Sequence, residues 1–157
     1  MENPVAISSQ QKLKRLFLFV FITSVIVTSC KVSLVATYDY MVAEKIEEVN
    51  KEIDKFYLVM LETTVNENGE RAYDKYSEQY IDIQLDLKSL LQKNKRREKN
   101  QETIQINQRI YDKWLEYKEI HETQNELSDA DIEANMMNMD NMLNTMLAAE
   151  QFKKAIK

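Results

Sequence analysis

Cys30 is the residue whose chemistry is most clearly indicated by its neighbours, and it is the only cysteine among 157 residues. Val27, Thr28 and Ser29 precede it, and these are residue types that a bacterial lipoprotein signal peptidase accepts before a cysteine. The thiol of such a cysteine carries lipid through a thioether bond, which leaves no thiol for a disulfide within the chain. We therefore predict cleavage after Ser29 and lipidation of Cys30.

The segment before these residues has the parts of an export signal. Lys12, Lys14 and Arg15 form a positive patch, and the apolar run LFLFVFITSVIV occupies residues 16–27. Its twelve residues suit the core of a secretory signal, whereas a helix that spans a bilayer needs about 20. The sequence predicts a signal peptide over residues 1–29. The alternative is an uncleaved signal anchor followed by a chance cysteine.

Lipidation would also give the protein a location. Two or three acyl chains hold a protein firmly at a membrane, whereas one gives only marginal binding. In enteric bacteria an aspartate after the lipidated cysteine favours retention in the inner membrane, so Lys31 favours the outer membrane. We predict a lipidated cysteine and a short tether over residues 30–38, followed by a periplasmic domain over residues 39–157.

The remaining sequence offers few groups for catalysis or metal binding. The residue three positions before His121, the only histidine, is Lys118, so the Glu-x-x-His motif of di-iron bundles is absent. One histidine cannot build a multi-histidine zinc site, and Gly69, the only glycine, cannot form a glycine-rich phosphate loop. We expect no enzyme, no cofactor and no metal, with His121 as a hydrogen-bonded core residue.

Charge and composition narrow the fold and the partners. The chain carries 21 Lys and Arg against 26 Asp and Glu, a net charge of −5, whereas nucleic-acid binding needs a basic footprint. One glycine and one proline occur, and so few turn-forming residues favour long helices over many short strands. The length fits a single domain behind the signal.

Hydrophobic side chains recur every three or four residues in four segments, which is the spacing of one face of a helix. We expect helices over residues 39–64 and 70–92, a third around residues 106–121, and a fourth from Ser128 onward. The four stripes are Val42, Ile46, Val49, Ile53, Phe56 and Met60; Tyr73, Tyr76, Tyr80, Ile83, Leu87 and Leu90; Ile106, Ile110, Trp114, Tyr117 and His121; and Ile132, Met136, Met139, Leu143 and Met146.

Local signals mark where these helices begin and end. Asp39 is a candidate N-cap, since its carboxylate can accept hydrogen bonds from the free amides of a first turn. Ser128 with Asp131 approximates a capping box in which aspartate replaces the usual glutamate, and residues 66–69 form a turn. Four helices of about 20 residues joined by short loops predict an all-α, antiparallel, up-down-up-down four-helix bundle.

Two surfaces are candidates for contact with a partner. Lys95, Arg96 and Arg97 lie in the one basic stretch of an acidic domain and could meet lipopolysaccharide phosphates or an acidic protein; the alternative is a solvated loop. Met137 and Met142 fall off the core stripe and could form an adaptable apolar strip. The alternative for these two methionines is core packing alone.

A third charged feature is a row of carboxylates at about four-residue intervals, formed by Asp74, Glu78, Asp82 and Asp86. Like charges at this spacing on a helix repel one another by a few tenths of a kcal/mol per pair. The row predicts either a weak surface for a divalent cation or a cationic partner, or simply a solvated face.

Four short stretches behind Cys30 are informative together: Ser33 to Asp39, Ala72 to Asp74, Asp82 to Leu87 and, loosely, the residues around His121. In these stretches the mature sequence resembles a group of small, uncharacterised Gram-negative lipoproteins. The resemblance spans most of the region behind Cys30. The resemblance implies a helical fold and a lipid-anchored location, and it implies no known activity.

Together these features predict a membrane-anchored adaptor that acts through protein–protein contacts in the cell envelope. We expect the lipid on Cys30 to hold the protein at the membrane and an envelope protein to be its partner. We expect no binding to nucleic acid. The alternative is a bundle that binds a small molecule or an ion in an aromatic pocket. Its lining would be Tyr73, Tyr76, Tyr80, Tyr111 and Trp114.

Overall fold

The computed structural model describes residues 34–63 and 70–156, together with residues 10 and 14. The predicted cleavage residues Val27, Thr28 and Ser29, the predicted lipidation site Cys30 and the predicted turn at 66–69 lie outside the described residues. The chain divides into two units, and the second begins at Leu34. Among the residues that are described, no helix has the length and apolar character needed to cross a membrane.

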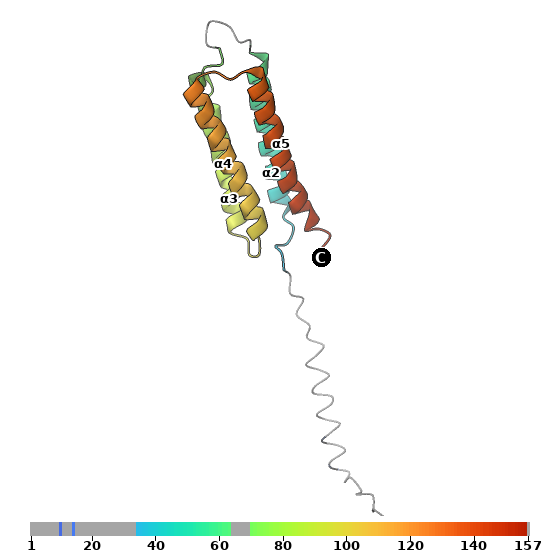
Figure 1. Ribbon diagram of the computed structural model, residues 1–157. Coiled ribbons are helices and arrows are strands. Elements are labelled where there is room, and N and C mark those ends of the chain that lie inside the picture. The colour runs from blue at the N-terminus through green and yellow to red at the C-terminus, as the bar shows by residue number, and fades with distance from the viewer. Residues whose placement is uncertain (1–9, 11–13, 15–33, 64–69, 157) are drawn as a thin grey trace, which may run out of the picture. The chain divides into compact units, whose positions relative to one another are not determined.

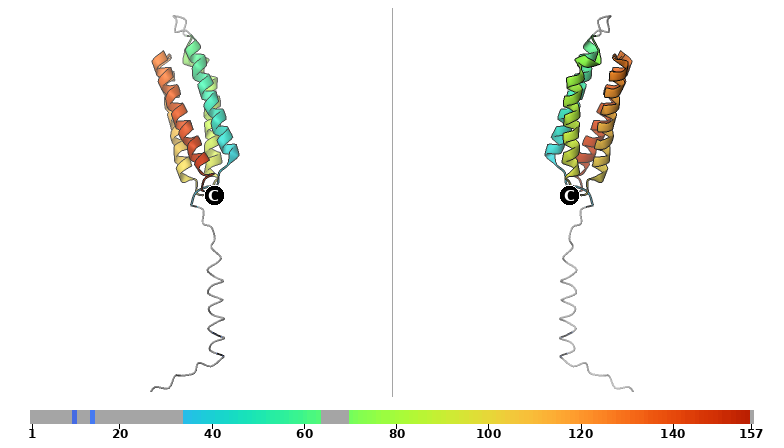
Figure 2. Two further views of the ribbon diagram at one scale, coloured as in Figure 1. Left: turned by 90° about the vertical axis from the view of Figure 1, so that its right-hand side faces the viewer. Right: turned by 90° about the vertical axis from the view of Figure 1, so that its left-hand side faces the viewer.

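The second unit is built from helices throughout its described part, which confirms the all-α prediction and is consistent with a four-helix bundle. The elements are α2 (Tyr40–Glu62), the 3₁₀ helix η1 (Tyr73–Lys75), α3 (Ser77–Lys95), α4 (Gln101–Gln124) and α5 (Asp129–Phe152). Helix α2 packs beside α3 and α5, and α4 also packs beside α3 and α5 (Figure 1, Figure 2).

The helix starts follow the predicted caps. A carboxylate oxygen of Asp39 accepts the amides of Met41 at 2.9 Å and of Val42 at 3.3 Å, so α2 begins where the sequence predicted. The capping box of Ser128 and Asp131 is also confirmed, since each side chain accepts a backbone amide of the other residue. Both caps satisfy first-turn amides that have no partner inside the helix.

Helix α3 begins seven residues later than the predicted start at residue 70, so that prediction is wrong. Ala72 has an extended backbone, and Tyr73 opens the short 3₁₀ helix η1. The amide of Tyr73 donates to the carbonyl of Asn125, which ends α4 in the left-handed conformation with φ 63°. A hydrogen bond to a residue more than 50 positions away thus replaces a helical turn, because tertiary contacts override local propensity.

The four predicted stripes form the core. All their members are buried except Tyr73, Ile106 and Met136, which are partly exposed and pack against the core edge. Trp114 lies at the centre: its ring centroid is 5.1 Å from Tyr80, 5.5 Å from Phe56 and 6.1 Å from Tyr57. Its indole nitrogen donates to the carbonyl of Tyr80 at 3.1 Å, so the buried donor is satisfied.

Candidate partner groove and the polar ends of the bundle

One end of the bundle is organised around Glu150, whose side chain is completely buried in α5. Its two carboxylate oxygens accept hydrogen bonds from both terminal nitrogens of Arg97, at 2.8 and 2.9 Å, and from the Nζ of Lys153 at 2.6 Å. The backbone amide of Asp39 donates to the same carboxylate at 2.8 Å. We call these four residues the Glu150 cluster; it joins the start of α2, the end of α3 and the end of α5.

The charge balance of the Glu150 cluster follows from these contacts. Burial alone raises the pKa of Glu150, but hydrogen bonds from Arg97, Lys153 and Asp39 outweigh it, so the pKa is lowered and the carboxylate stays charged. Burial lowers the pKa of Lys153, and Glu150 opposes that shift. The Nζ of Lys153 also donates to Asn100 at 2.7 Å and to Thr103 at 2.9 Å, which brings in the start of α4.

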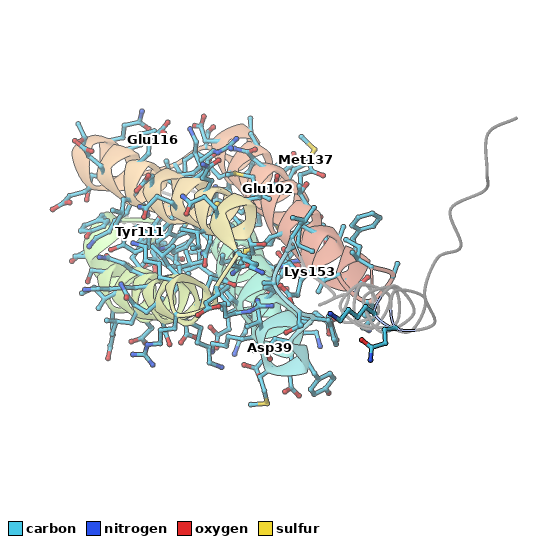
Figure 3. All side chains as sticks on the ribbon, turned by 90° about the horizontal axis from the view of Figure 1, so that it is seen from below. Asp39, Glu102, Tyr111, Glu116, Met137 and Lys153 are labelled. Atoms are coloured by element: carbon cyan, nitrogen blue, oxygen red, sulfur yellow. The ribbon has the colours of Figure 1, made fainter. Side chains whose placement is uncertain are left out.

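The segment just before α2 is held against this end of the bundle (Figure 3). The amide of Ala36 donates to the carbonyl of Lys99 at 2.9 Å, and the carbonyl of Thr37 accepts from Arg97. The ring of Tyr38 lies 4.2 Å from the Nζ of Lys154. Residues 36–38, the end of the predicted tether, therefore contact the bundle.

Sequence reasoning missed the Glu150 cluster, although a signal was present. Glu150 continues the spacing of the fourth stripe, four residues after Met146, and Asn94 continues the second stripe in the same way. Asn94 is fully buried, and its side-chain amide donates to Asn107 at 3.2 Å. Polar residues in a core register are rarely buried unless they are paired, so they predict a buried polar network.

A second polar cluster surrounds Arg71, of which 2% is exposed. Its guanidinium donates to the carbonyls of Leu61 at 3.2 Å, Thr63 at 2.7 Å and Leu127 at 3.4 Å. It also forms an ion pair with Asp129 at the start of α5. Carbonyls at the end of α2 carry the negative end of the helix dipole, which favours a cation there.

His121 lies beside this Arg71 cluster and is fully buried, as predicted. Its Nε2 is 2.8 Å from the carbonyl of Arg71, and its Nδ1 is 3.1 Å from the hydroxyl of Tyr80. Because a carbonyl can only accept, we assign the proton to Nε2, and Nδ1 accepts from Tyr80. Burial lowers the pKa of His121, with the Arg71 carbonyl opposing, so the imidazole is neutral at pH 7 and acts as a structural hydrogen-bonding group.

The aromatic residues proposed for a ligand pocket pack against one another and against the core. Tyr80 lies 5.9 Å from Tyr73 and 5.6 Å from His121, and Tyr76 lies 5.9 Å from Phe56. Tyr111 sits at the core edge, where its hydroxyl accepts from Gln84. These contacts give each ring a packing role.

A groove of about 610 Å³ runs between α2 and α3. Val59 and Leu85 line it and are 48% and 57% exposed. We call it the α2–α3 groove. Its apolar residues are Phe56, Val59, Tyr76, Ile83 and Leu85, and its polar residues are Glu52, Lys55, Gln79, Asp82 and Asp86.

Carboxylates crowd the wall of the groove. Asp86 accepts from the Nζ of Lys45 at 2.9 Å. The pKa of Glu52 is raised, first by burial and then by its hydrogen bond with Asp86 and the repulsion between the two groups, while Lys45 opposes the shift. An approaching cation would relieve this repulsion.

The predicted carboxylate row is divided by the structure. Asp82 and Asp86 line the α2–α3 groove, whereas Asp74 belongs to η1 and Glu78 to the first turn of α3. Within the described residues, no group of three or more His, Cys, Asp or Glu side chains is arranged to hold a metal ion.

The predicted basic surface is also divided. Lys95, which ends α3, and Arg96, which follows it, are exposed. Arg97 turns inward to Glu150, and only 14% of its side chain is exposed. Arg97 therefore serves the fold, and the structure leaves two of the three predicted cations on the surface.

The two predicted methionines lie on different faces of α5. Met137 is 64% exposed. Met142 is partly buried, packs against the core, and lines a hollow of about 220 Å³ with Ile106 and Arg109. The structure does not bring them together, because five residues turn a helix by well over a quarter of a circle.

No protein-family model, no curated protein and no solved structure matches this chain. The resemblance to small Gram-negative lipoproteins therefore stays a prediction.

Proposed function

We propose that this chain is a lipid-anchored bacterial envelope protein that binds another protein in the α2–α3 groove and has no catalytic role. The observation that carries the proposal is the groove itself, which is lined by Val59 and Leu85, two exposed apolar side chains. Apolar grooves between helices are a common way to receive an amphipathic helix. We also propose that the protein lies at the periplasmic side of the outer membrane. The predicted anchor at Cys30 and the lysine that follows it, Lys31, support this location.

The antiparallel, up-down-up-down order of the helices is part of the proposal, and the two polar clusters support it. The Glu150 cluster joins the start of α2 with the ends of α3 and α5. The Arg71 cluster joins the end of α2 with the start of α5 and the segment before α3. Opposite ends of successive helices therefore meet in each cluster, as an alternating order requires.

The chemistry of the α2–α3 groove favours a basic amphipathic helix as the partner element. The apolar side chains provide surface for its hydrophobic face, and Glu52, Asp82 and Asp86 provide charge for lysine or arginine at its edges. Complementary charge around an apolar contact raises the association rate and suppresses wrong partners more than it raises affinity. The carboxylates are therefore expected to select the partner, and Val59 with Leu85 to hold it.

Lipidation is tested by metabolic labelling with a fatty-acid analogue in a bacterial host. The full chain is expected to incorporate the label, and the Cys30→Ala chain is expected to incorporate none, because Cys30 is the only thiol. A Ser128→Ala chain, altered far along the sequence, is the matched control and keeps the label. Label on the Cys30→Ala protein would show that Cys30 is not the acceptor.

The groove is tested by site-specific photo-crosslinking in intact cells. A photoreactive amino acid at position 85 is expected to give one discrete adduct with an envelope protein. The same amino acid at position 137 is the control, since Leu85 and Met137 are similarly exposed, at 57% and 64%, on different helices.

Charge selection is tested in the same assay. The double change Glu52→Gln and Asp82→Asn removes charge from the groove while leaving the ion pair of Asp86 with Lys45 in place. The adduct from position 85 is expected to weaken in this variant. An adduct that is absent from position 85, or identical from positions 85 and 137, would refute the groove as the binding site.

A further inference from the structure

The end of the bundle that holds the Glu150 cluster exposes several large apolar side chains. Leu34 is 83% exposed just before the docked segment, and Phe152 and Ile156 are 66% and 47% exposed at the end of the chain. Phe152 is the last residue of α5, two positions after Glu150. Solvent-exposed apolar side chains grouped in this way mark an interaction surface.

Cations surround these apolar residues. Lys93 and Lys95 lie in the last turn of α3, Arg96 follows them, and Lys154 follows α5. All four are exposed, and exposed carboxylates near them in the sequence are Glu98, between α3 and α4, and Glu102, in the first turn of α4. This end is therefore basic within a chain whose net charge is −5. We call the exposed residues Leu34, Lys95, Arg96, Phe152, Lys154 and Ile156 the basic end.

The length of chain before the basic end limits its distance from the membrane. Six residue steps separate Cys30 from Ala36, whose backbone amide donates to the carbonyl of Lys99. Six extended residues span at most about 20 Å. An anchor at Cys30 thus keeps this end of the bundle within about 20 Å of the lipid headgroups, which is about two and a half Debye lengths at physiological salt.

We propose that the basic end lies flat on the phospholipid surface, with Phe152, Ile156 and Leu34 among the headgroups and Lys95, Arg96 and Lys154 on their phosphates. The inference rests on the membrane anchor of the proposed function. Lysine and arginine near an anionic surface each contribute about 1 kcal/mol, and apolar side chains add burial at the interface.

The Glu150 cluster makes the contact directional. The amide of Asp39 donates to Glu150, the carbonyl of Thr37 accepts from Arg97, and the amide of Ala36 donates to Lys99, so a pivot of the bundle about Asp39 would break these hydrogen bonds. The α2–α3 groove begins at Glu52, twelve residues after the start of α2. At about 1.5 Å per residue, the α2 side of the groove then lies about 18–29 Å along the helix from the start of α2, away from the basic end, where a partner can reach it.

The test uses the full chain reconstituted in vesicles of phosphatidylglycerol and brominated phosphatidylcholine, whose bromine atoms quench tryptophan on contact. Phe152→Trp and Met137→Trp place the probe at two similarly exposed positions of α5, 15 residues apart. Trp114 is fully buried and supplies a constant background. We expect loss of the added emission in Phe152→Trp and no loss in Met137→Trp.

Serine at positions 95, 96 and 154 in the Phe152→Trp chain is expected to restore its emission, because the phosphate contacts are removed. Equal quenching at positions 152 and 137, or none at either, overturns the inference. Fatty-acid labelling of Cys30 is read out separately. If Cys30 is labelled but positions 152 and 137 are quenched alike, the lipid anchor is supported and membrane contact by the basic end is refuted. If position 152 alone is quenched but Cys30 carries no label, membrane contact by the basic end is supported and lipidation is refuted.

Discussion

Replacing Glu150 with alanine is expected to lower the free energy of unfolding by about 3–5 kcal/mol, the cost of breaking a buried ion pair by removing one partner. The substitution leaves Arg97 and Lys153 inside the bundle with no carboxylate between them, and it removes the acceptor of the Asp39 amide. Urea denaturation followed by circular dichroism measures the loss. Because stabilities of single domains are about 5–15 kcal/mol, this change is among the most damaging available.

The control is Glu133→Ala, which removes an exposed glutamate from the same helix and is expected to change stability by no more than about 0.5 kcal/mol. A triple variant with Glu150→Met, Arg97→Met and Lys153→Met tests whether the cluster stabilises the fold or only specifies it. Buried charge networks can often be exchanged for apolar side chains at little cost. A Glu150→Ala protein as stable as the Glu133→Ala protein would contradict the assigned role of Glu150.

The same cluster predicts a pH dependence with a definite sign. The pKa of Glu150 is lowered in the folded state, so its stabilisation is complete above the unfolded value near 4.5 and is lost as pH falls through the folded value. The difference between wild type and Glu150→Ala should therefore shrink below about pH 4.5. The lowered pKa of His121 acts in a separate window, since its contribution is complete above about 6.5 and declines at lower pH.

Replacing Arg71 with alanine is expected to cost about 2–4 kcal/mol, because hydrogen bonds to a charged group are worth about 1.5–3 kcal/mol and buried acceptors are left unsatisfied. The carbonyls of Leu61, Thr63 and Leu127 would all lose their guanidinium donor. Thermal and urea denaturation measure the effect. The substitution should lower the free energy of unfolding without changing the apolar core. The helical circular dichroism signal at low temperature should therefore be retained.

Arg71→Lys should recover part of the stability, because an ammonium group can reach only some of the acceptors that a planar guanidinium reaches together. Arg109→Ala is the matched control, since Arg109 is exposed on α4 and its removal should change stability by less than about 0.5 kcal/mol. If Arg71→Ala unfolds at the same urea concentration as Arg109→Ala, the guanidinium does not hold this end of the bundle together.

The helices and the core were predictable because their signals are local. An apolar residue every three or four positions produces a stripe on any helix, and the stripes from Val42 to Met60 and from Ile132 to Met146 became core with one partly exposed exception, Met136. Asp39 and Ser128 bond to amides two or three residues away, so their capping is also visible in a short stretch of sequence. Interactions of this range need no knowledge of the rest of the chain.

The predictions that failed or fell short depend on partners that are far away in the sequence. Arg97 looked like a surface cation because its acceptor, Glu150, lies 53 residues later. The helix predicted from residue 70 starts at Ser77 because Arg71 bonds to Leu127 and Tyr73 bonds to Asn125. The α2–α3 groove could not be predicted either, because Val59 and Leu85 border one cavity only once two helices are placed side by side.

One physical cause separates the features that the sequence determines from those that only the tertiary structure decides. Helix formation, capping and the choice of a buried face depend on residues within about one or two helical turns, so the amino-acid order specifies them directly. The pairing of Glu150 with Arg97, the burial of Arg71 and the shape of the groove depend on which side chains meet when helices pack. A charged side chain gains little from a partner in water and a great deal from one in a buried site. The bundle therefore decides which of the many charges are structural and which remain at the surface for a membrane or a partner.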